Sequence, residues 1–312
     1  MTLCTATLTR LVPLTAQITE FTLEGDDLPP FAPGAHIRVE LPDGDTRAYS
    51  LIRMTAADAA VASYTIAVQR EDGGKGGSRF MHGLREGVQL RFAPPKCDFP
   101  VDTGAPAVLL AGGIGVTPLI SMAAALDEAG QAFAFHYAAR SAGVMAYRDA
   151  LAARFGDRVH LHFDDDASAL NLEAVIGALG QANLYICGPR GLIDTARTRA
   201  EAAGIAAGRV HVELFDTPAP VQGETGFEVE LSSSGQVFTV APGQSIIDAL
   251  EAGGVDVLYD CRRGDCGICQ CGVIEGVPDH RDVVLSAEER AAGNVMQICV
   301  SRAKTPRLVL DL

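Results

Sequence analysis

The sequence predicts a protein of three consecutive domains: a small β-barrel, a doubly wound α/β domain built on a parallel sheet, and an α+β domain. Three observations predict this order. Short strands separated by turns fill residues 1–103, strands and helices alternate over residues 104–216, and four cysteines crowd into residues 261–271. At 312 residues the chain also exceeds the size that one core usually reaches.

The first domain, residues 1–103, carries the pattern of a barrel. Apolar and polar residues alternate over short stretches, and turns rich in Pro, Gly and Asp separate them, as at residues 28–34 and 42–44. Several short strands at this spacing are typical of a small barrel or sandwich. The expected strands cover residues 6–11, 18–23, 36–41, 64–68 and 88–92.

The second domain, residues 104–216, mixes both kinds of element. Residues 107–111 form a continuous apolar run, and a helical pattern over residues 118–129 ends at Gly130. Strands that alternate with helices imply a parallel sheet covered on both faces. Further strands are expected at residues 132–138, 159–163, 183–187 and 210–214, and further helices at residues 147–154 and 191–203.

The third domain follows a short segment that contains proline and lacks apolar periodicity. We therefore expect a linker over residues 217–224 and a separate domain over residues 225–312. A hairpin-like pair of strands at residues 227–231 and 236–241 and a helix near residues 245–252 should precede the cysteine-bearing loop. Two or three more strands are expected after it.

The net charge limits the classes of binding partner, and the N-terminal sequence indicates the cellular location. The formal charge of −14 at pH 7 argues against nucleic acid and anionic lipid, and it fits either solubility or attraction to a basic protein partner. No basic start with an apolar run precedes Phe21, so we expect a cytoplasmic protein without a signal peptide. Residues 105–126 lack charge, but their Gly and Pro residues predict a buried strand, a turn and a helix instead of a membrane span.

The cysteines give the strongest signal of chemistry. Cys261, Cys266 and Cys269 have the spacing C-x4-C-x2-C, and Cys299 follows 29 residues later. This is the plant-type spacing for a [2Fe–2S] cluster held by four thiolates. Glycines between the ligands let backbone N–H groups face the sulfurs, which stabilises the more negative, reduced cluster.

Two alternatives accompany this interpretation. A structural zinc site with four cysteines usually pairs two short knuckles, whereas here one loop supplies three ligands. Cys271 lies two residues beyond Cys269, at strand spacing, so its side chain should point the same way. We interpret Cys271 as a packed thiol, with ligand exchange as the alternative. Cys4, Cys97 and Cys187 are expected to be small buried residues.

A flavin site is predicted by two segments of the first domain. Alternation on a strand places Arg47, Tyr49 and Leu51 on one face and Ser50 on the other, which offers a cation, a flat ring and a hydroxyl. The glycine-rich run at residues 73–78 could form a nest of N–H groups for phosphate, with a helix beginning near Ser78. A flexible turn is the alternative interpretation of that run.

A dinucleotide site is predicted where the first strand of the second domain ends. The loop at residues 112–118 follows that strand and opens a helix, which is the setting for a pyrophosphate. Pro118 stands where the standard fingerprint has a third glycine, and it suits the first turn of a helix. A tightly packed turn without a ligand is the alternative. Cys187, Gly188 and Pro189 end a later strand, where open sheets bind ligands.

Taken in order, these segments resemble the phthalate dioxygenase reductase family, which includes vanillate O-demethylase reductases and lies within the ferredoxin–NADP reductase superfamily. The resemblance covers essentially the whole chain and implies a flavin β-barrel, a nucleotide domain and a plant-type ferredoxin domain of β-grasp fold. It is carried by Cys299 and by the motifs RAYSL, GGKGGSRFMH, AGGIGVTPLISM, HYAARS, HFDD, CGPRG, HVELF and CRRGDCGIC.

The resemblance also implies roles for single residues. Arg47, Tyr49 and Ser50 would hold FMN, with Ser50 near the reactive N5, and Gly76, Gly77 and Ser78 would bind its phosphate. The dinucleotide contacts would be Gly113, Thr117, Cys187, Gly188 and Pro189. Phe215 would cover the flavin until nicotinamide displaces it, unless it is an ordinary core phenylalanine. The resemblance implies NADH, whereas Arg140 and Ser141 leave NADPH open.

The expected function is therefore electron transfer from NADH through FMN and the cluster to a terminal oxygenase, of the Rieske non-haem iron type by resemblance, with the chain acting as a monomer. One alternative is a redox sensor or carrier without nicotinamide turnover, against which the paired nucleotide loops argue. Another is a reductase for a diiron hydroxylase. Those relatives generally carry the ferredoxin domain first, and here it comes last.

Overall fold

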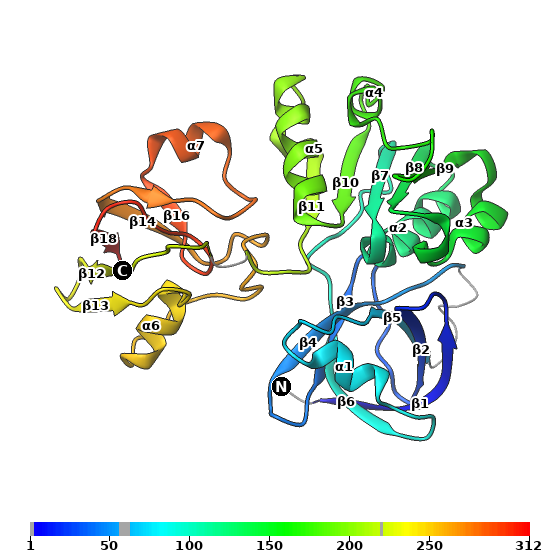
Figure 1. The fold of residues 1–312 in the computed structure, drawn as a ribbon, viewed down its shortest axis with the longest axis horizontal. Coiled ribbons are helices and arrows are strands. Elements are labelled where there is room, and N and C mark those ends of the chain that lie inside the picture. Colours follow the sequence, from blue (N-terminus) through cyan, green and yellow to red (C-terminus); the bar gives the residue numbers. More distant parts are fainter. Residues whose placement is uncertain (1–2, 56–62, 219–220) are drawn as a thin grey trace. The chain divides into compact units, whose positions relative to one another are not determined.

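The structure is a computed structural model, and it describes residues 3–55, 63–218 and 221–312. The chain forms two compact units, Met1–Glu213 and Leu214–Leu312. In Figure 1 the first unit runs from the blue barrel strands to the green helices and strands, and the second runs from yellow to red.

The first half of the first unit is a closed barrel. Its strands form one sheet in the order β4-β3-β6-β1-β2-β5, and every neighbouring pair is antiparallel. A bridge between Ile52 and Thr65 joins the two edges, because it links the residues after β4 to β5. The barrel elements are β1 (Cys4–Pro13), β2 (Ile18–Glu24), β3 (His36–Glu40), β4 (Thr46–Ser50), β5 (Ser63–Gln69), α1 (Gly77–His82) and β6 (Gln89–Lys96).

The second half of this unit is a parallel five-stranded sheet in the order β11-β10-β7-β8-β9. The central strand β7 is buried along its whole length, which explains its uninterrupted apolar sequence. Chain order reverses between β7 and β10, so their carboxyl ends form the switch point at which such sheets bind ligands. The elements are β7 (Ala107–Gly112), α2 (Val116–Glu128), β8 (Phe133–Ala139), α3 (Arg148–Phe155), β9 (Val159–Phe163), α4 (Leu172–Gly177), β10 (Asn183–Cys187), α5 (Arg190–Ala202) and β11 (Val210–Glu213).

A buried serine on α2 joins the barrel to the parallel sheet. The Ser121 hydroxyl donates to the carbonyl of Leu51 and accepts from the backbone N–H of Arg53, each over 2.8 Å. The side chain of Ser121 is fully buried. Because Leu51 directly follows β4, this pair of bonds holds the predicted flavin strand against the helix that starts at the predicted nucleotide loop.

The second unit is a mixed five-stranded sheet with one main helix. Its order is β13-β12-β18-β14-β16, in which β12 and β18 are parallel and the other pairs antiparallel. Ser245 caps α6 through a reciprocal pair of bonds with Asp248, as in a capping box. The elements are β12 (Phe227–Leu231), β13 (Val237–Val240), α6 (Ile246–Ala252), β14 (Gln270–Glu275), β15 (Pro278–Asp279), α7 (Ala287–Ala292), β16 (Val295–Gln297), β17 (Arg302–Ala303) and β18 (Arg307–Asp311).

The predicted fold class is confirmed, and most expected elements lie within a few residues of the observed ones. The first helix of the α/β domain begins at Val116, two residues before the expected Pro118. Two short helices, α4 and α7, were not predicted; α7 has no buried residue and therefore no apolar period to detect. Of the predicted linker, residues 219–220 lie outside the described residues. Among the described residues, no helix is both long and apolar enough to cross a bilayer.

Candidate functional site

Arg47 on β4 is held in place by three acceptors. Its guanidinium donates to the Asp45 carboxylate over 2.5 Å, to the Thr46 carbonyl over 2.8 Å and to the Lys75 carbonyl over 3.4 Å. The bond from Arg47 holds the pKa of the Asp45 carboxyl below its usual value. Arg47 therefore reaches from the strand to the glycine-rich loop, as a residue that binds a phosphate beside that loop would.

The glycine-rich loop fits directly against Arg47. Gly76 has a φ of 93°, and α1 begins at the next residue. A Cβ on Gly77 would lie only 2.5 Å from Cγ of Arg47, so the arginine stem rests on this glycine. The first N–H groups of a helix have no partner within the helix and bind anions well. A cation and a helix start thus come together, and these residues fit a flavin phosphate.

Of the other predicted flavin residues, one fixes the glycine-rich loop and three are packed in or beside the barrel core. The Ser78 hydroxyl accepts from the N–H of Glu71 over 3.0 Å, so it also fixes the loop. Tyr49 packs on the barrel core, and burial raises the pKa of its hydroxyl to about 12. Ser50 is buried. Leu51 is fully buried in the core, and its N–H and carbonyl bond to Ala35 and Ser121. Contact between Leu51 and the flavin stays a prediction.

Gly77→Ala should weaken flavin binding without unfolding the barrel. The new methyl group would push Arg47 away from the loop, and we expect roughly tenfold weaker FMN retention because a charge-assisted phosphate contact is lost. Equilibrium dialysis against FMN measures the change. Gly73→Ala in the same loop is the matched control, since no described atom lies within 4 Å of its Cβ. Equal FMN affinity of the two variants would contradict the assignment of the phosphate site.

The loops after β7 and β10 pack backbone against backbone. A Cβ on Gly115 would lie 2.2 Å from the carbonyl oxygen of Cys187, and a Cβ on Gly188 would lie 2.9 Å from Cα of Gly112. The short 3-10 turn η2 (Gly113–Gly115) carries the chain from β7 into α2. The glycines therefore serve close packing, which is the alternative interpretation, and Gly113 at the start of η2 faces open space. Close packing is compatible with the predicted dinucleotide contact of Gly113.

The predicted dinucleotide residues differ in how open they are. No described atom lies within 4 Å of a Cβ built on Gly113, so that residue faces open space. The Thr117 hydroxyl donates to the carbonyl of Ile114 over 3.1 Å, and the residue is buried. Cys187 is fully buried, and Pro189 precedes the first residue of α5. Phe215 is half-buried in the second unit, and its predicted contact with the flavin stays a prediction.

The four predicted cluster ligands come together in the second unit. Cys261, Cys266 and Cys269 lie on the loop between α6 and β14, and Cys299 follows β16. Hydrogen bonds from the Cys266 and Cys299 thiols hold the pKa of the Cys261 thiol well below its usual range. A hydrogen bond from Cys299 likewise lowers the pKa of the Cys269 thiol. The sulfurs thus contact one another within one site. The same hydrogen bonds raise the pKa of the donor thiols Cys266 and Cys299, so Cys261 and Cys269 are the two sulfurs favoured as thiolates.

The sulfur contacts form a chain, because Cys261 contacts Cys266 and Cys299, and Cys299 also contacts Cys269. Among the described residues, no three His, Cys, Asp or Glu side chains are placed to hold a single metal ion. Each iron of a [2Fe–2S] cluster takes only two of the four thiolates, so such a cluster does not need three side chains around one ion. The backbone N–H of Arg263 donates to the sulfur of Cys261 over 3.3 Å, as expected for a loop that binds negatively charged sulfur.

Cys271 contacts backbone carbonyls of β14 and β18. Its thiol lies 3.3 Å from the carbonyl of Gly272 and 3.7 Å from the carbonyl of Asp311 at the end of β18. Burial raises the pKa of the thiol to about 11. These contacts support the interpretation of Cys271 as a packed thiol.

Sequence reasoning missed Asp265, which lies between two of the predicted ligands. Its carboxylate accepts from the backbone N–H of Leu214 over 2.9 Å and lies 3.5 Å from Arg263. Burial raises the pKa of this carboxyl to about 6. The letters CRRGDC carry no signal for this contact, because the partner is a backbone group 51 residues away.

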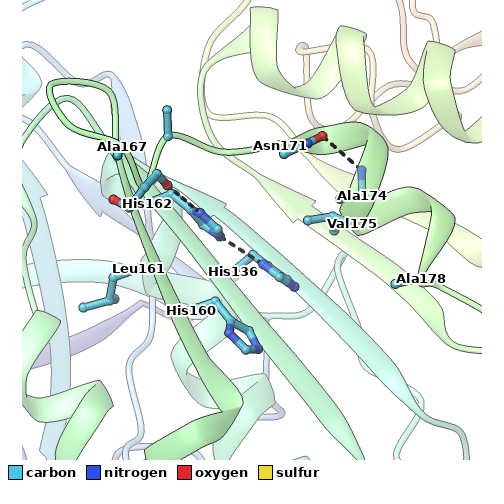
Figure 2. Close-up of a pocket in the computed structure, with 11 residues that line it drawn as sticks. His136, His160, Leu161, His162, Ala167, Asn171, Ala174, Val175 and Ala178 are labelled. Atoms are coloured by element: carbon cyan, nitrogen blue, oxygen red, sulfur yellow. Dashed lines mark hydrogen bonds between the residues drawn. The ribbon is translucent and has the colours of Figure 1, made fainter.

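A second missed feature is a row of three histidines on the parallel sheet, shown in Figure 2. His136 on β8 stacks on His160 and His162 of β9, with ring centres 4.7 and 5.3 Å apart. They line a hollow of about 570 Å³ beside α4. The Ser168 carbonyl can only accept, so Nδ1 of His162 carries a proton, and Nε2 of His162 accepts from Nδ1 of His136 over 3.0 Å.

The histidine row predicts acid sensitivity. Burial, then the charges of His160 and His162, lowers the pKa of His136 from 6.5 to about 4. Between these values the unfolded chain binds more protons than the native chain, so the free energy of unfolding should fall as pH drops from 6.5 to 4. After discounting for solvent screening, we expect a loss of about 1 kcal/mol.

Urea denaturation of the full chain at pH 7.5 and pH 5 would measure this loss. His136→Leu removes the titrating ring, so the variant should show a smaller difference between the two pH values. An unchanged difference in the variant would exclude His136 as the source.

Comparison with known proteins agrees with this arrangement. A family model described as "2Fe-2S iron-sulfur cluster binding domain" matches residues 229–304. The chain is 45% identical to "Phenoxybenzoate dioxygenase subunit beta" of Ectopseudomonas oleovorans, over 92% of this chain and 89% of that protein. It is 38% identical to "Vanillate O-demethylase oxidoreductase" of Pseudomonas sp. (strain HR199 / DSM 7063), over 93% of this chain and 92% of that protein.

Solved structures agree over the whole chain. The structure of phthalate dioxygenase reductase, described as modular for electron transfer from pyridine nucleotides to [2Fe–2S], matches with a TM-score of 0.72 and 34% identity over 99% of this chain and 98% of that one. Full-length CYP116B46 from Tepidiphilus thermophilus matches with a TM-score of 0.77 and 34% identity over 99% of this chain, which spans only 42% of that protein.

The barrel, the nucleotide loops and the four grouped thiols together define an NAD(P)H-dependent flavin iron–sulfur oxidoreductase. More particularly, the chain belongs to the phthalate dioxygenase reductase family. The resemblance found in the sequence is thereby confirmed.

Proposed function

We propose that this chain is the reductase component of a multicomponent oxygenase or O-demethylase. In this proposal it passes electrons from NADH through FMN and the [2Fe–2S] cluster to a terminal oxygenase of the Rieske type. The observation that carries the proposal is the meeting of four thiols in a chain that also has two glycine-packed loops at the switch point of a parallel sheet. We infer also that it works as a monomer in the cytoplasm, where clustered thiols stay reduced.

The chain contributes positioning rather than acid–base chemistry. When bound, the flavin supplies the conversion of a two-electron hydride donor into single electrons for the cluster. Arg47 and the start of α1 would anchor the phosphate of FMN, and the loops around Gly115 and Cys187 would hold the dinucleotide at the end of the sheet. Alignment of two rings needs no proton donor. The histidines therefore need no role in this step.

NADH is the proposed donor. Asp164, Asp165 and Asp166 directly follow β9 at the carboxyl edge of the sheet, and three carboxylates there would repel a 2′-phosphate. Arg140 follows β8 at the same edge and would attract one. The excess of negative charge supports NADH. The ratio of kcat/KM for NADH and NADPH tests this preference.

Anaerobic addition of NADH to the purified protein tests the proposal. The flavin absorbance should bleach at least as fast as the enzyme turns over, and reduction of the cluster should follow. Denaturation of the protein should release FMN. Absence of bleaching would favour the sensor or carrier alternative. Reconstitution with a purified Rieske oxygenase and, separately, with a diiron hydroxylase distinguishes the two classes of acceptor, since only the proposed partner should turn over.

A further inference from the structure

A glutamine side chain is buried against one of the predicted cluster ligands. Gln297 ends β16 and is fully buried, whereas glutamine is mostly exposed in proteins. Its Oε1 accepts from the thiol of Cys269 over 3.5 Å, and its Nε2 donates to Oε1 of Gln270 over 3.0 Å. The amide of Gln297 therefore lies between the sulfur of Cys269 and an exposed side chain at the start of β14.

Backbone bonds fix the position of Gln297 beside Cys269. Gln270 and Gln297 are directly opposed in the antiparallel pair of β14 and β16, so their side chains share one face. The N–H of Ile298 donates to the carbonyl of Cys269 over 3.3 Å. The carbonyl of Gln297 accepts from the N–H of Ser301 over 3.0 Å, which closes the turn after β16. The strand and the turn together hold the amide at the sulfur.

The orientation of the amide suits a thiol and not a metal ligand. Cys269 binds iron as a thiolate, which has no proton to donate and can only accept. An amide oxygen facing that sulfur would leave two buried acceptors against each other, which is costly. Half a turn about the Cγ–Cδ bond of Gln297 exchanges Oε1 and Nε2 and brings an N–H to the sulfur. The amide of Gln270 carries donors as well as an acceptor, so it can turn in the same way and donate to Oε1 of Gln297.

We propose that Gln297 donates an amide N–H to the sulfur of Cys269 when that sulfur is bound to iron, and that this bond raises the reduction potential of the cluster. Reduction adds one electron, taken from the flavin, and makes the sulfurs more negative. A hydrogen bond to a sulfur strengthens with that charge and so favours the reduced state. Because Gln297 is fully buried, water does not compete for the bond. The inference rests on the proposed function, which makes Cys269 a ligand.

Gln297→Leu tests this role, because it removes the amide from a side chain of similar size. We expect the ratio of reduced to oxidised cluster at a fixed potential to fall about tenfold, which equals a shift of about 59 mV to more negative potential for a one-electron couple. Anaerobic redox titration of the holoprotein, followed by electron paramagnetic resonance, measures the shift. Gln236→Leu is the matched control, since it makes the same change at an exposed residue just before β13 and should keep the parental potential.

Gln270→Glu tests the turn of the amide from the outside. Gln270 is exposed, so this variant should fold and keep its cluster. An ionised carboxylate can only accept, so it should hold Nε2 of Gln297 turned away from the sulfur. Pulsed electron paramagnetic resonance of the reduced protein in H₂O and D₂O detects exchangeable protons near the cluster. The parent chain should show one such proton that both Gln297→Leu and Gln270→Glu lack. An added charge at residue 270 shifts the potential but does not remove a proton, so this spectrum separates the two causes.

Each outcome decides one claim. A parental potential and proton spectrum in Gln297→Leu, with intact iron–sulfur absorbance, would overturn the role of Gln297. If that variant loses its cluster, Gln270→Glu decides instead, and a parental proton spectrum there would overturn the role equally. A parent chain without iron–sulfur absorbance would refute the proposed function itself.

Discussion

Cys299→Ser is expected to abolish NADH-driven reduction of an external acceptor such as cytochrome c, by about 100-fold or more, because a cluster that loses one of its ligands is lost or poorly held. Cys299 contacts both Cys261 and Cys269, so its loss removes the residue that joins the two ends of the site. Bleaching of the flavin by NADH should survive, since the residues predicted for those two cofactors lie in the first unit, apart from Phe215.

Cys271→Ser is the matched control for this experiment. Cys271 lies on β14, two residues after Cys269 at the end of the cluster loop, but its thiol contacts the backbone carbonyl of Asp311. The control should keep its iron–sulfur absorbance and its acceptor reduction. Visible and electron paramagnetic resonance spectra measure the cluster in both variants. A parental spectrum and rate in Cys299→Ser, or loss of both in Cys271→Ser, would show that the ligand set is wrongly assigned.

Gly115→Ala is expected to have the second large effect, on the use of NADH. The new methyl carbon would lie 2.2 Å from the carbonyl oxygen and 2.4 Å from the carbonyl carbon of Cys187. These are backbone atoms of the neighbouring strand end, so the two loops must separate. A displacement of the order of 1 Å at a site that aligns two rings can lower the rate about 100-fold. We expect a loss of that size in kcat/KM for NADH.

Steady-state kinetics with NADH and the FMN content of the purified variants would check this second effect. FMN content should stay near the parental value, because Gly115 lies outside the barrel. Gly191→Ala on the first turn of α5 is the control, since no described atom lies within 4 Å of its Cβ. Equal kcat/KM in the two alanine variants would show that packing of the loops does not position the dinucleotide.

Much of the fold could be predicted because local patterns carry it. The uninterrupted apolar run of β7 indicates a strand covered on both faces, and the alternation in the first domain indicates a sheet with one buried face. A barrel was predicted for this domain, but the strand pairing that closes it could not be. Among the described residues, a bridge between Ile52 and Thr65 joins the two sheet edges, and no sequence pattern reports such a pairing.

The site residues that could be predicted are likewise those whose signal is local in the sequence. The spacing of Cys261, Cys266 and Cys269 in one loop is a local property, so the sequence reveals it. The contact between Asp265 and Leu214, like the stack of His136 on His160, joins residues far apart in the chain. Such contacts depend on strand register and on the course of the chain in three dimensions, and neither can be predicted from local patterns in a single sequence.

The hydroxyl of Ser121 connects the two halves of the first unit within five residues of the start of α2. The two bonds of Ser121 therefore link the backbone of Leu51 and Arg53 to that helix. If a dinucleotide displaces the helix and thereby alters flavin affinity, flavin must alter dinucleotide affinity by the same factor. Titration with NAD⁺ should therefore perturb the flavin spectrum before any electron has moved.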